Sequence, residues 1–103
     1  WAWEVAQSLD RDGAGCWVAV RDGEILGFAA YGANRPSWFG PMGTAPAAEG
    51  LGVGRVLLRR CLADQRADGH STAQIGWAGP VAFYAKTVGA RLERIFWIYT
   101  KQL

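Results

Sequence analysis

The sequence predicts an α/β (α+β) fold in which a mixed, largely antiparallel and splayed sheet is flanked by helices. Three observations lead to this class: strand-like runs in the first half, a long amphipathic helix pattern beginning at Val53, and alternating strand and helix patterns after it. The chain has 103 residues, of which 50% are hydrophobic, and it contains no repeat or internal linker. We therefore assign residues 1–103 to a single small domain with one core.

Apolar residues at the start of the chain recur at helical spacing. Trp1, Val5 and Leu9 lie one helical turn apart, and the turn-forming residues 10–13 follow them. The spacing predicts a short amphipathic helix that ends before Asp10.

A hairpin pattern follows. Residues 16–20 and 24–31 are rich in strand-forming side chains and flank Asp22-Gly23, a dipeptide suited to the positive φ angles of a tight turn. We expect two antiparallel strands joined at this turn.

The next strand pattern is interrupted. After a loop over residues 32–37, residues 38–44 continue as a strand that contains Gly40 and Pro41. Proline cannot donate to a strand ladder, and glycine in a strand often marks a bulge. This strand should bulge or splay from its neighbour.

Residues 53–67 carry the main helix. Its charged residues lie mostly off the apolar face, and Gly69 ends it. The apolar face consists of Val53, Leu57, Leu58, Cys61 and Leu62.

Shorter elements complete the chain. Residues 71–76 predict a strand, and Gly79-Pro80 begins a second helix over residues 81–88 that Gly89 ends. Residues 91–101 predict a final strand.

Composition and charge exclude several functions. The net charge of +2 comes from interspersed residues, which argues against nucleic-acid binding but tolerates a polyanionic ligand. Neither a run of about 18 apolar residues nor a signal-peptide pattern occurs, so we expect no membrane association and a cytoplasmic location. Cys16 and Cys61 stand in apolar patterns with only His70 as a further soft ligand, which predicts buried free thiols and no metal site.

The junction before the main helix is the most informative local feature. Gly50, Gly52 and Gly54 alternate as the chain enters the helix. A helix N-terminus leaves backbone N–H groups unpaired and carries about half a positive elementary charge, and glycine lets an anion approach without meeting a Cβ atom. The junction therefore suits a phosphate.

Two motifs together resemble the GCN5-related N-acetyltransferase (GNAT) superfamily. The first, Pro46-x-x-Glu49-Gly50-x-Gly52-x-Gly54, opens a long helix after a kinked strand, and the second, Phe83-Tyr84-x-Lys86-x-x-Gly89-Ala90, follows the next strand. The resemblance covers residues 16–103. It implies a mixed, splayed sheet, acetyl-CoA as the cofactor, and transfer of the acetyl group to an amine.

The resemblance assigns cofactor contacts to two segments. On the kinked strand, the backbone of Met42, Gly43 and Thr44 would pair with the pantetheine amides and polarise the thioester carbonyl. At the helix start, backbone N–H groups would bind the CoA pyrophosphate, and a guanidinium could add a charge-assisted contact. The residues of this second group are Gly50, Leu51, Gly52, Val53, Gly54 and Arg55.

The resemblance also makes Tyr84 the catalytic acid that protonates the departing CoA thiolate. From the residues alone, Phe83 and Tyr84 are equally suited to a helix-core role. The general base for the amine stays open between a bound water, an already neutral amine and four side chains. These are Glu4, Glu24, His70 and Glu93.

Two positions depart from the family pattern. Glu49 stands where the family usually has Arg or Gln and places a carboxylate near the diphosphate. At about 6 Å and an effective dielectric near 20 this contact costs roughly 3 kcal/mol, which water screening reduces toward 1. The alternative is that Glu49 only stabilises the helix N-terminus. Trp77 stands where many relatives have an Asn that contacts the pantetheine arm, so apolar packing would have to replace a hydrogen bond.

The chain also lacks the opening strand and most of the first helical segment that precede the hairpin in this family. Such a domain exposes a strand edge and apolar surface. We therefore predict a homodimer or association with a missing N-terminal region.

Two functions from different classes follow. The first is an acetyl-CoA-dependent N-acetyltransferase that moves an acetyl group to a small-molecule or peptide amine by direct attack in a ternary complex. The second is a degenerate GNAT-like CoA-binding or dimerisation module without catalysis. An unrelated nucleotide-binding module is more distant, because it would need a ribose-binding acid after the helix, and Asp64 and Asp68 fall inside it.

Overall fold

The computed structural model describes residues 3, 5, 6 and 9–103. Trp3, Val5 and Ala6 are helical, and the Leu9 N–H donates to the Val5 carbonyl at 3.2 Å. The predicted N-terminal helix is therefore confirmed where it is described, whereas Trp1 and Glu4 lie outside the described residues.

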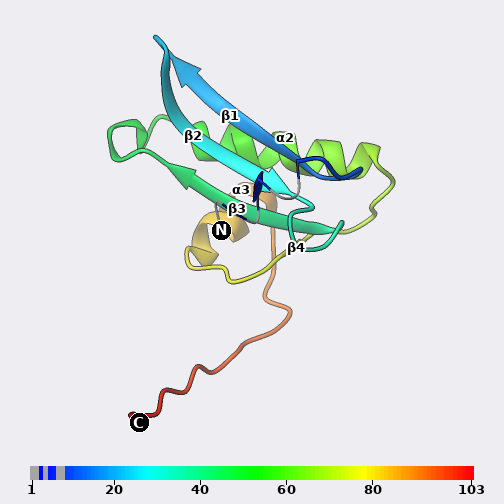
Figure 1. The fold of residues 1–103 in the computed structure, drawn as a ribbon, viewed down its shortest axis with the longest axis vertical. Helices are drawn as coiled ribbons and strands as arrows, with labels where there is room; N and C mark the ends of the chain where they lie inside the picture. The colour runs from blue at the N-terminus through cyan, green and yellow to red at the C-terminus, as the bar shows by residue number, and fades with distance from the viewer. Residues whose placement is uncertain (1–2, 4, 7–8) are drawn as a thin grey trace.

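Four strands form one sheet in the order β1-β2-β3-β4 (Figure 1). β1 (Gly15–Arg21), β2 (Glu24–Tyr31) and β3 (Trp38–Thr44) are antiparallel neighbours, and β4 (Gln74–Ile75) runs parallel to β3. The mixed, largely antiparallel sheet predicted by the sequence is confirmed.

The β1–β2 hairpin turns at Asp22 and Gly23, whose φ angles are 53° and 79°. Both angles are positive, as the mirror-image turns of two-residue hairpins require. β2 has its predicted bounds, and β1 is one residue longer at each end than predicted.

β3 is kinked at Gly40, whose φ is 112°. Phe39 pairs with Tyr31 and Met42 with Ala29, so β3 carries one extra residue against β2 at this point. On its other side β3 pairs with β4 only through Trp38 and Phe39. The rest of β3 has no described strand beside it there, which confirms the predicted bulge and splay.

Helix α2 (Val53–Ala67) crosses one face of the sheet behind β1 and β2 (Figure 1). It begins after the short helix η1 (Pro46–Ala48), and α3 (Val81–Val88) lies beyond β4. Helices α2 and α3 have the predicted bounds. Their core contacts with the sheet involve Ala29, Tyr31, Phe39, Leu57, Leu58, Cys61 and Tyr84.

The buried Gln65 fixes α2 to the start of β3. Its Nε2 donates to the carbonyls of Pro36 at 3.2 Å and Trp38 at 3.1 Å. This pair of hydrogen bonds holds the end of the loop between β2 and β3 against the helix, where β3 begins to pair with β4.

The two cysteines are free thiols. Cys61 is buried and donates to the Ala29 carbonyl at 3.3 Å, and burial raises its pKa to about 12. The prediction of a buried thiol is confirmed for Cys61, whereas Cys16 is half-buried.

The predicted final strand over residues 91–101 is wrong. These residues are exposed and belong to no strand, and the chain runs away from the body (Figure 1). A run of β-branched and aromatic residues shows that a segment is suited to a sheet, but it does not place a partner strand beside it. β4 is also shorter than the predicted residues 71–76. None of the helices in the described part of the chain is long and apolar enough to cross a membrane.

Candidate active site

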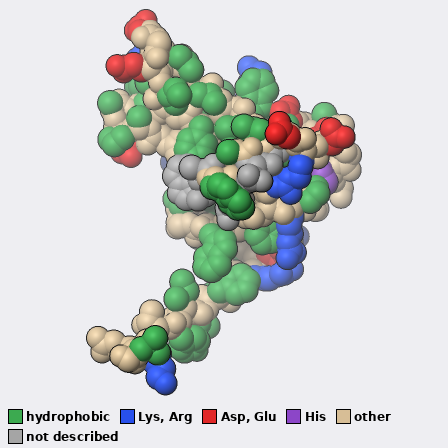
Figure 2. Space-filling model, in the orientation of Figure 1, with side chains coloured by type: hydrophobic (Ala, Val, Ile, Leu, Met, Phe, Trp, Pro, Cys, Tyr) green, Lys and Arg blue, Asp and Glu red, His purple; other side chains and the backbone are tan. Residues whose placement is uncertain are grey.

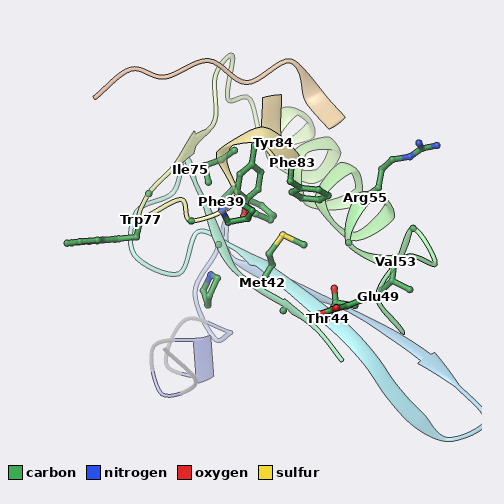
Figure 3. Close-up of a pocket in the computed structure, with 18 of the residues that line it drawn as sticks. Phe39, Met42, Thr44, Glu49, Val53, Arg55, Ile75, Trp77, Phe83 and Tyr84 are labelled. Atoms are coloured by element: carbon green, nitrogen blue, oxygen red, sulfur yellow. The ribbon is translucent and has the colours of Figure 1, made fainter. Parts of the chain in front are cut away.

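A cavity of about 1030 Å³ opens where β3 separates from β4 (Figure 3). Its walls come from β3, the connection between η1 and α2, residues 75–80 and α3. The structure brings together every predicted site residue except Leu51, which is exposed and outside the lining. The predicted residues in the lining are Met42, Gly43, Thr44, Gly50, Gly52, Val53, Gly54, Arg55 and Tyr84.

The start of α2 forms one end of the cavity. Its N-cap, Gly52, has a φ of 80°, and no side chain caps the helix. The Val56 N–H donates to the Gly52 carbonyl at 3.2 Å, so the N–H groups of Val53 to Arg55 have no helical carbonyl one turn earlier. A Cβ added at Gly50 or Gly52 would meet no atom within 4 Å. The geometry leaves an accessible set of backbone donors for an anion.

Gly54 lines the cavity where α2 faces β3 and α3. A Cβ built there would lie 3.3 Å from Met42 Cε, 3.6 Å from Thr44 Oγ1 and 3.6 Å from Phe83 Cζ. These contacts join α2, β3 and α3. A large side chain at Gly54 would therefore occupy the space between the two ends of the cavity.

Tyr84 forms the other end. It is 8% exposed and packs edge-on against Phe39 and Phe83, at ring-centroid distances of 6.1 and 5.2 Å. Burial raises the pKa of Tyr84 above its ordinary value of 10. The phenol is therefore protonated at neutral pH and can donate a proton toward the cavity.

The predicted site residues do not include Phe39 and Ile75, yet both line the cavity beside Tyr84 (Figure 3). They are paired across β3 and β4 at the last rung before the strands separate. The signal that could have found them is this register, because the last paired residues of a splaying sheet border the gap.

Three charged or aromatic residues named from the sequence differ in how they face the cavity. Glu49 is exposed in the lining, beside Thr44 and Val53, so its carboxylate stands at the glycine-rich end. The Arg55 side chain extends away from the cavity, which leaves only its backbone N–H at the expected place (Figure 3). Trp77 also points away, is 85% exposed and has a φ of 53°. In this orientation the Trp77 ring does not cover the cavity.

No general base emerges from the named candidates. Glu24, His70 and Glu93 all lie outside the lining, and Glu4 is not among the described residues. Glu93 Oε2 accepts a hydrogen bond from Gln74 Nε2 at 3.0 Å. Within the described ranges, no group of three His, Cys, Asp or Glu side chains could hold a metal ion.

The fold and the cavity define a class of α/β domain that can hold an elongated, partly anionic ligand between two separating strands. Residues 12–87 match the family described as Acetyltransferase (GNAT) domain. The chain belongs to this family. Among curated proteins, none matches the sequence significantly.

Solved structures share the fold. The aminoglycoside 6'-N-acetyltransferase AAC(6')-IG from Acinetobacter haemolyticus matches 98% of this chain and 79% of its own, with a TM-score of 0.73 and 15% identity. Aminoglycoside N-acetyltransferase AAC(6')-Iy, solved with CoA, has the same TM-score and identity; the match covers 94% of this chain and 83% of that protein. A GNAT family acetyltransferase from Brucella melitensis, solved with acetyl-CoA, is 29% identical, with a TM-score of 0.59 over 81% of this chain and 58% of its own.

Proposed function

We propose that this chain is an acetyl-CoA-dependent N-acetyltransferase that acts on a small-molecule or peptide amine by direct attack in a ternary complex. The observation that carries the proposal is a single cavity that joins an open, glycine-rich helix start to a buried tyrosine. An anion-binding end and a proton-donating end are the two features that this reaction needs.

The residues present fit acetyl-CoA. The N–H groups at the start of α2 suit the pyrophosphate, since they lack helical partners and the glycines leave the backbone accessible. The edge of β3 from Gly40 to Thr44 has no described strand on the cavity side, so it can pair with the pantetheine amides. Met42, Gly43 and Thr44 belong to this edge.

The chemistry follows from these positions. Bound acetyl-CoA supplies an activated acetyl group. A backbone N–H of β3 would donate to the thioester oxygen. In other enzymes, removal of one such donor raises the activation free energy by roughly 3 kcal/mol. As the amine nitrogen forms a bond to the carbonyl carbon and the carbon–sulfur bond breaks, the Tyr84 hydroxyl would give its proton to the sulfur. An amine that arrives protonated first loses a proton to water; the N–H proton released as the amide forms also passes to water, and water returns a proton to the Tyr84 phenolate.

The lining also bears on the acceptor. The labelled neighbours of Tyr84 in the lining, Phe39, Ile75 and Phe83, are apolar, and the acidic member of the lining, Glu49, lies at the opposite end. Polycationic amines need carboxylates close to the transfer point. We therefore propose an acceptor that carries little positive charge beyond the reacting amine.

One observation favours a second function, a GNAT-like module that binds CoA weakly or associates with other chains without catalysis. Glu49 places a carboxylate in the lining at the end proposed for the pyrophosphate. Two like charges at that separation repel, although exposure to water reduces the effect.

Calorimetric titration with acetyl-CoA tests the proposal, with acetyl-pantetheine as the matched ligand that lacks the diphosphate. Micromolar binding of acetyl-CoA, and much weaker binding of acetyl-pantetheine, is the expected result. Thiol release with a panel of amines then separates the two functions. Binding without thiol release favours the module. No binding at millimolar acetyl-CoA contradicts the transferase and leaves only a module that associates with other chains.

A further inference from the structure

The loop between β2 and β3 ends in a tight turn that brings two side chains together. Residues 35–38 read Arg-Pro-Ser-Trp, and the Trp38 N–H donates to the Arg35 carbonyl at 2.9 Å. Proline suits the second position of such a turn, because its ring fixes φ in the required range. The Arg35 guanidinium carbon stands 5.1 Å from the centre of the Trp38 ring. The turn therefore holds an arginine against an aromatic face.

The Trp38 ring is itself fixed, so it supports the guanidinium in one place. Its Nε1 donates to Gln74 Oε1 at 2.7 Å. The ring also packs directly on the backbone of Gly76, where an added Cβ would lie 2.5 Å from Trp38 Cζ3. The Gln74 N–H donates to the Ser37 carbonyl at 3.0 Å, and the buried Gln65 donates to the Trp38 carbonyl. A ligand that binds here therefore loses little affinity to the ordering of side chains.

This turn borders the end of the main cavity that holds Tyr84. Asn34 and Trp38 both belong to the lining, and Arg35 stands on the Trp38 ring. The next residue, Phe39, packs edge-on against Tyr84. The loop lies beside β4 (Figure 1), and Figure 2 shows Lys and Arg side chains along this side of the molecule. A cation and a carboxamide thus stand at the end of the cavity where the acceptor would bind.

The Arg35 guanidinium is available to a ligand. Its side chain is exposed, and in the part of the chain that the structure describes it contacts the Trp38 ring and forms no ion pair. Glu93, the acid joined to this cluster, accepts its hydrogen bond from Gln74 Nε2 at 3.0 Å. The acidic residue of the main lining, Glu49, lies at the opposite end. The guanidinium therefore keeps its N–H donors for an incoming group.

We propose that Arg35 and Asn34 form a carboxylate subsite, so that the acceptor is an amine that also carries a carboxylate. A guanidinium presents paired N–H donors in one plane, which matches the two oxygens of a carboxylate, and stacking on an aromatic ring leaves these donors free. The Asn34 carboxamide can donate a further N–H. One cation and one neutral amide match a single negative charge. The inference rests on the proposed acetyl transfer, whose acceptor it specifies.

The distribution of charge along the cavity would orient such an acceptor. The proposed pyrophosphate position is at the start of α2, and Arg35 stands near the other end, so the two anionic groups are kept apart. Glu49 at the α2 end repels a carboxylate and so favours the same orientation. The apolar side chains of Phe39 and Ile75 then contact the rest of the acceptor, whose amine lies between the carboxylate and the thioester.

Pairs of acceptors that differ only in the carboxylate test the inference. Phenylalanine and phenethylamine place it next to the amine, and aminohexanoate and pentylamine place it at the far end of an alkyl chain. In at least one pair, kcat/KM should favour the carboxylate member by about tenfold, through a lower KM, because a hydrogen-bonded charge pair contributes about this much. Thiol release without a preference in either pair overturns the inference and leaves the transferase intact.

Matched variants assign the preference to Arg35, which is necessary because a carboxylate also changes the basicity of a nearby amine. Arg35→Gln should lower the ratio within the preferred pair about tenfold, and Arg35→Lys, which keeps the charge but loses the planar fork, should lower it less. Arg21→Gln, at the exposed end of β1 and outside the lining, makes the same change in net charge and should keep the ratio. A ratio that survives Arg35→Gln, or that Arg21→Gln lowers equally, contradicts the inference.

Binding of the N-acetyl derivatives of the same four amines separates this inference from the proposed function, because it requires no catalysis. Calorimetry should show about tenfold tighter binding of the carboxylate member in the preferred pair, and Arg35→Gln should remove the difference. If no amine releases thiol but this difference is found, acetyl transfer is contradicted and the carboxylate subsite stands. Equal binding within both pairs overturns the subsite. If Arg35→Gln folds poorly, Arg35→Lys provides the assignment.

Discussion

The two ends of the main cavity are built in opposite ways. At the α2 end the groups available to a ligand are backbone N–H groups, and the surrounding residues Gly50 and Gly52 are exposed. At the α3 end the functional group is the side chain of Tyr84, packed among aromatic rings. Substitutions at the α2 end can therefore weaken ligand binding only by adding bulk or charge. Proton donation at the α3 end depends on one hydroxyl group.

This difference separates binding from chemistry. Backbone donors at a helix start hold a phosphate in the ground state and throughout the reaction, so they lower the dissociation constant without raising the turnover rate. A proton donor acts only as the leaving group departs, so it raises the turnover rate. Changes at the α2 end should therefore alter acetyl-CoA affinity, and changes at the α3 end should alter the turnover rate.

Tyr84→Phe should give the largest effect. Removing the hydroxyl should lower kcat by ~100-fold, the lower end of the usual range for acid–base catalysis, and leave the dissociation constant of acetyl-CoA within twofold. Steady-state kinetics and calorimetry measure the two values. Tyr31→Phe is the matched control, because the Tyr31 hydroxyl donates to Asp64 Oδ2 at 3.1 Å, away from the lining. It should lower stability by about 1 kcal/mol and spare kcat. Equal loss of folding and binding in Tyr84→Phe would show that the residue serves packing.

Alkaline pH should distinguish the same two tyrosines. Burial raises the pKa of Tyr84 above 10, so kcat should fall only above pH 10, as the proton needed by the leaving group is lost. This fall should be absent in Tyr84→Phe. The pKa of Tyr31 is raised to about 12, first by burial and then by the hydrogen bond to Asp64. Its contribution to stability is fully present below pH 10 and is lost as the pH rises toward 12. In urea denaturation, the free energy of unfolding of Tyr31→Phe should fall less between pH 10 and 12 than that of the unmodified protein. An equal fall in both proteins would contradict the assignment.

Gly54→Leu adds bulk where α2 faces β3 and α3 across the cavity. The new side chain begins 3.3 Å from Met42 Cε and has to occupy the cavity, so acetyl-CoA affinity should fall by ~30-fold, or about 2 kcal/mol. Stability should change little or rise, since leucine favours a helix more than glycine does by roughly 1 kcal/mol. Ala63→Leu, on an exposed position of the same helix, is the control and should not affect binding. Undiminished affinity in Gly54→Leu would mean that the ligand does not pass this point.

The sequence predicted the glycine-rich end better than the rest of the molecule. Gly52, Gly69 and Gly89 terminate or open helices through local conformation, so the bounds of α2 and α3 follow from residues that are neighbours in the chain. The Asp22-Gly23 turn has the same local cause. The family motifs then placed the proposed cofactor contacts, and all of them except Leu51 lie in one cavity.

What the sequence missed depends on contacts between distant segments. Phe39 and Ile75 border the site because β3 and β4 separate just after them, and neither residue carries a local signal for that role. Residues 91–101 have a strong strand pattern but lie beside no strand, since pairing requires a partner that the pattern does not supply. The outward directions of Arg55 and Trp77 likewise depend on side-chain conformation. The cytoplasmic location stays a prediction.

Glu49→Gln should give the smallest effect and the only gain. Glu49 stands in the lining at the glycine-rich end, where removal of its charge should strengthen acetyl-CoA binding by ~5-fold, equivalent to about 1 kcal/mol after screening by water. The gain should shrink as salt is added, because exposed charges are screened, and acetyl-pantetheine should bind equally to both proteins. Glu24→Gln, at the distant start of β2, controls for the change in net charge. If Glu49→Gln weakens binding instead, the carboxylate stabilises the start of α2 and does not repel the ligand. The α2 end would then not be limited by charge, although the α3 end would still depend on the Tyr84 hydroxyl.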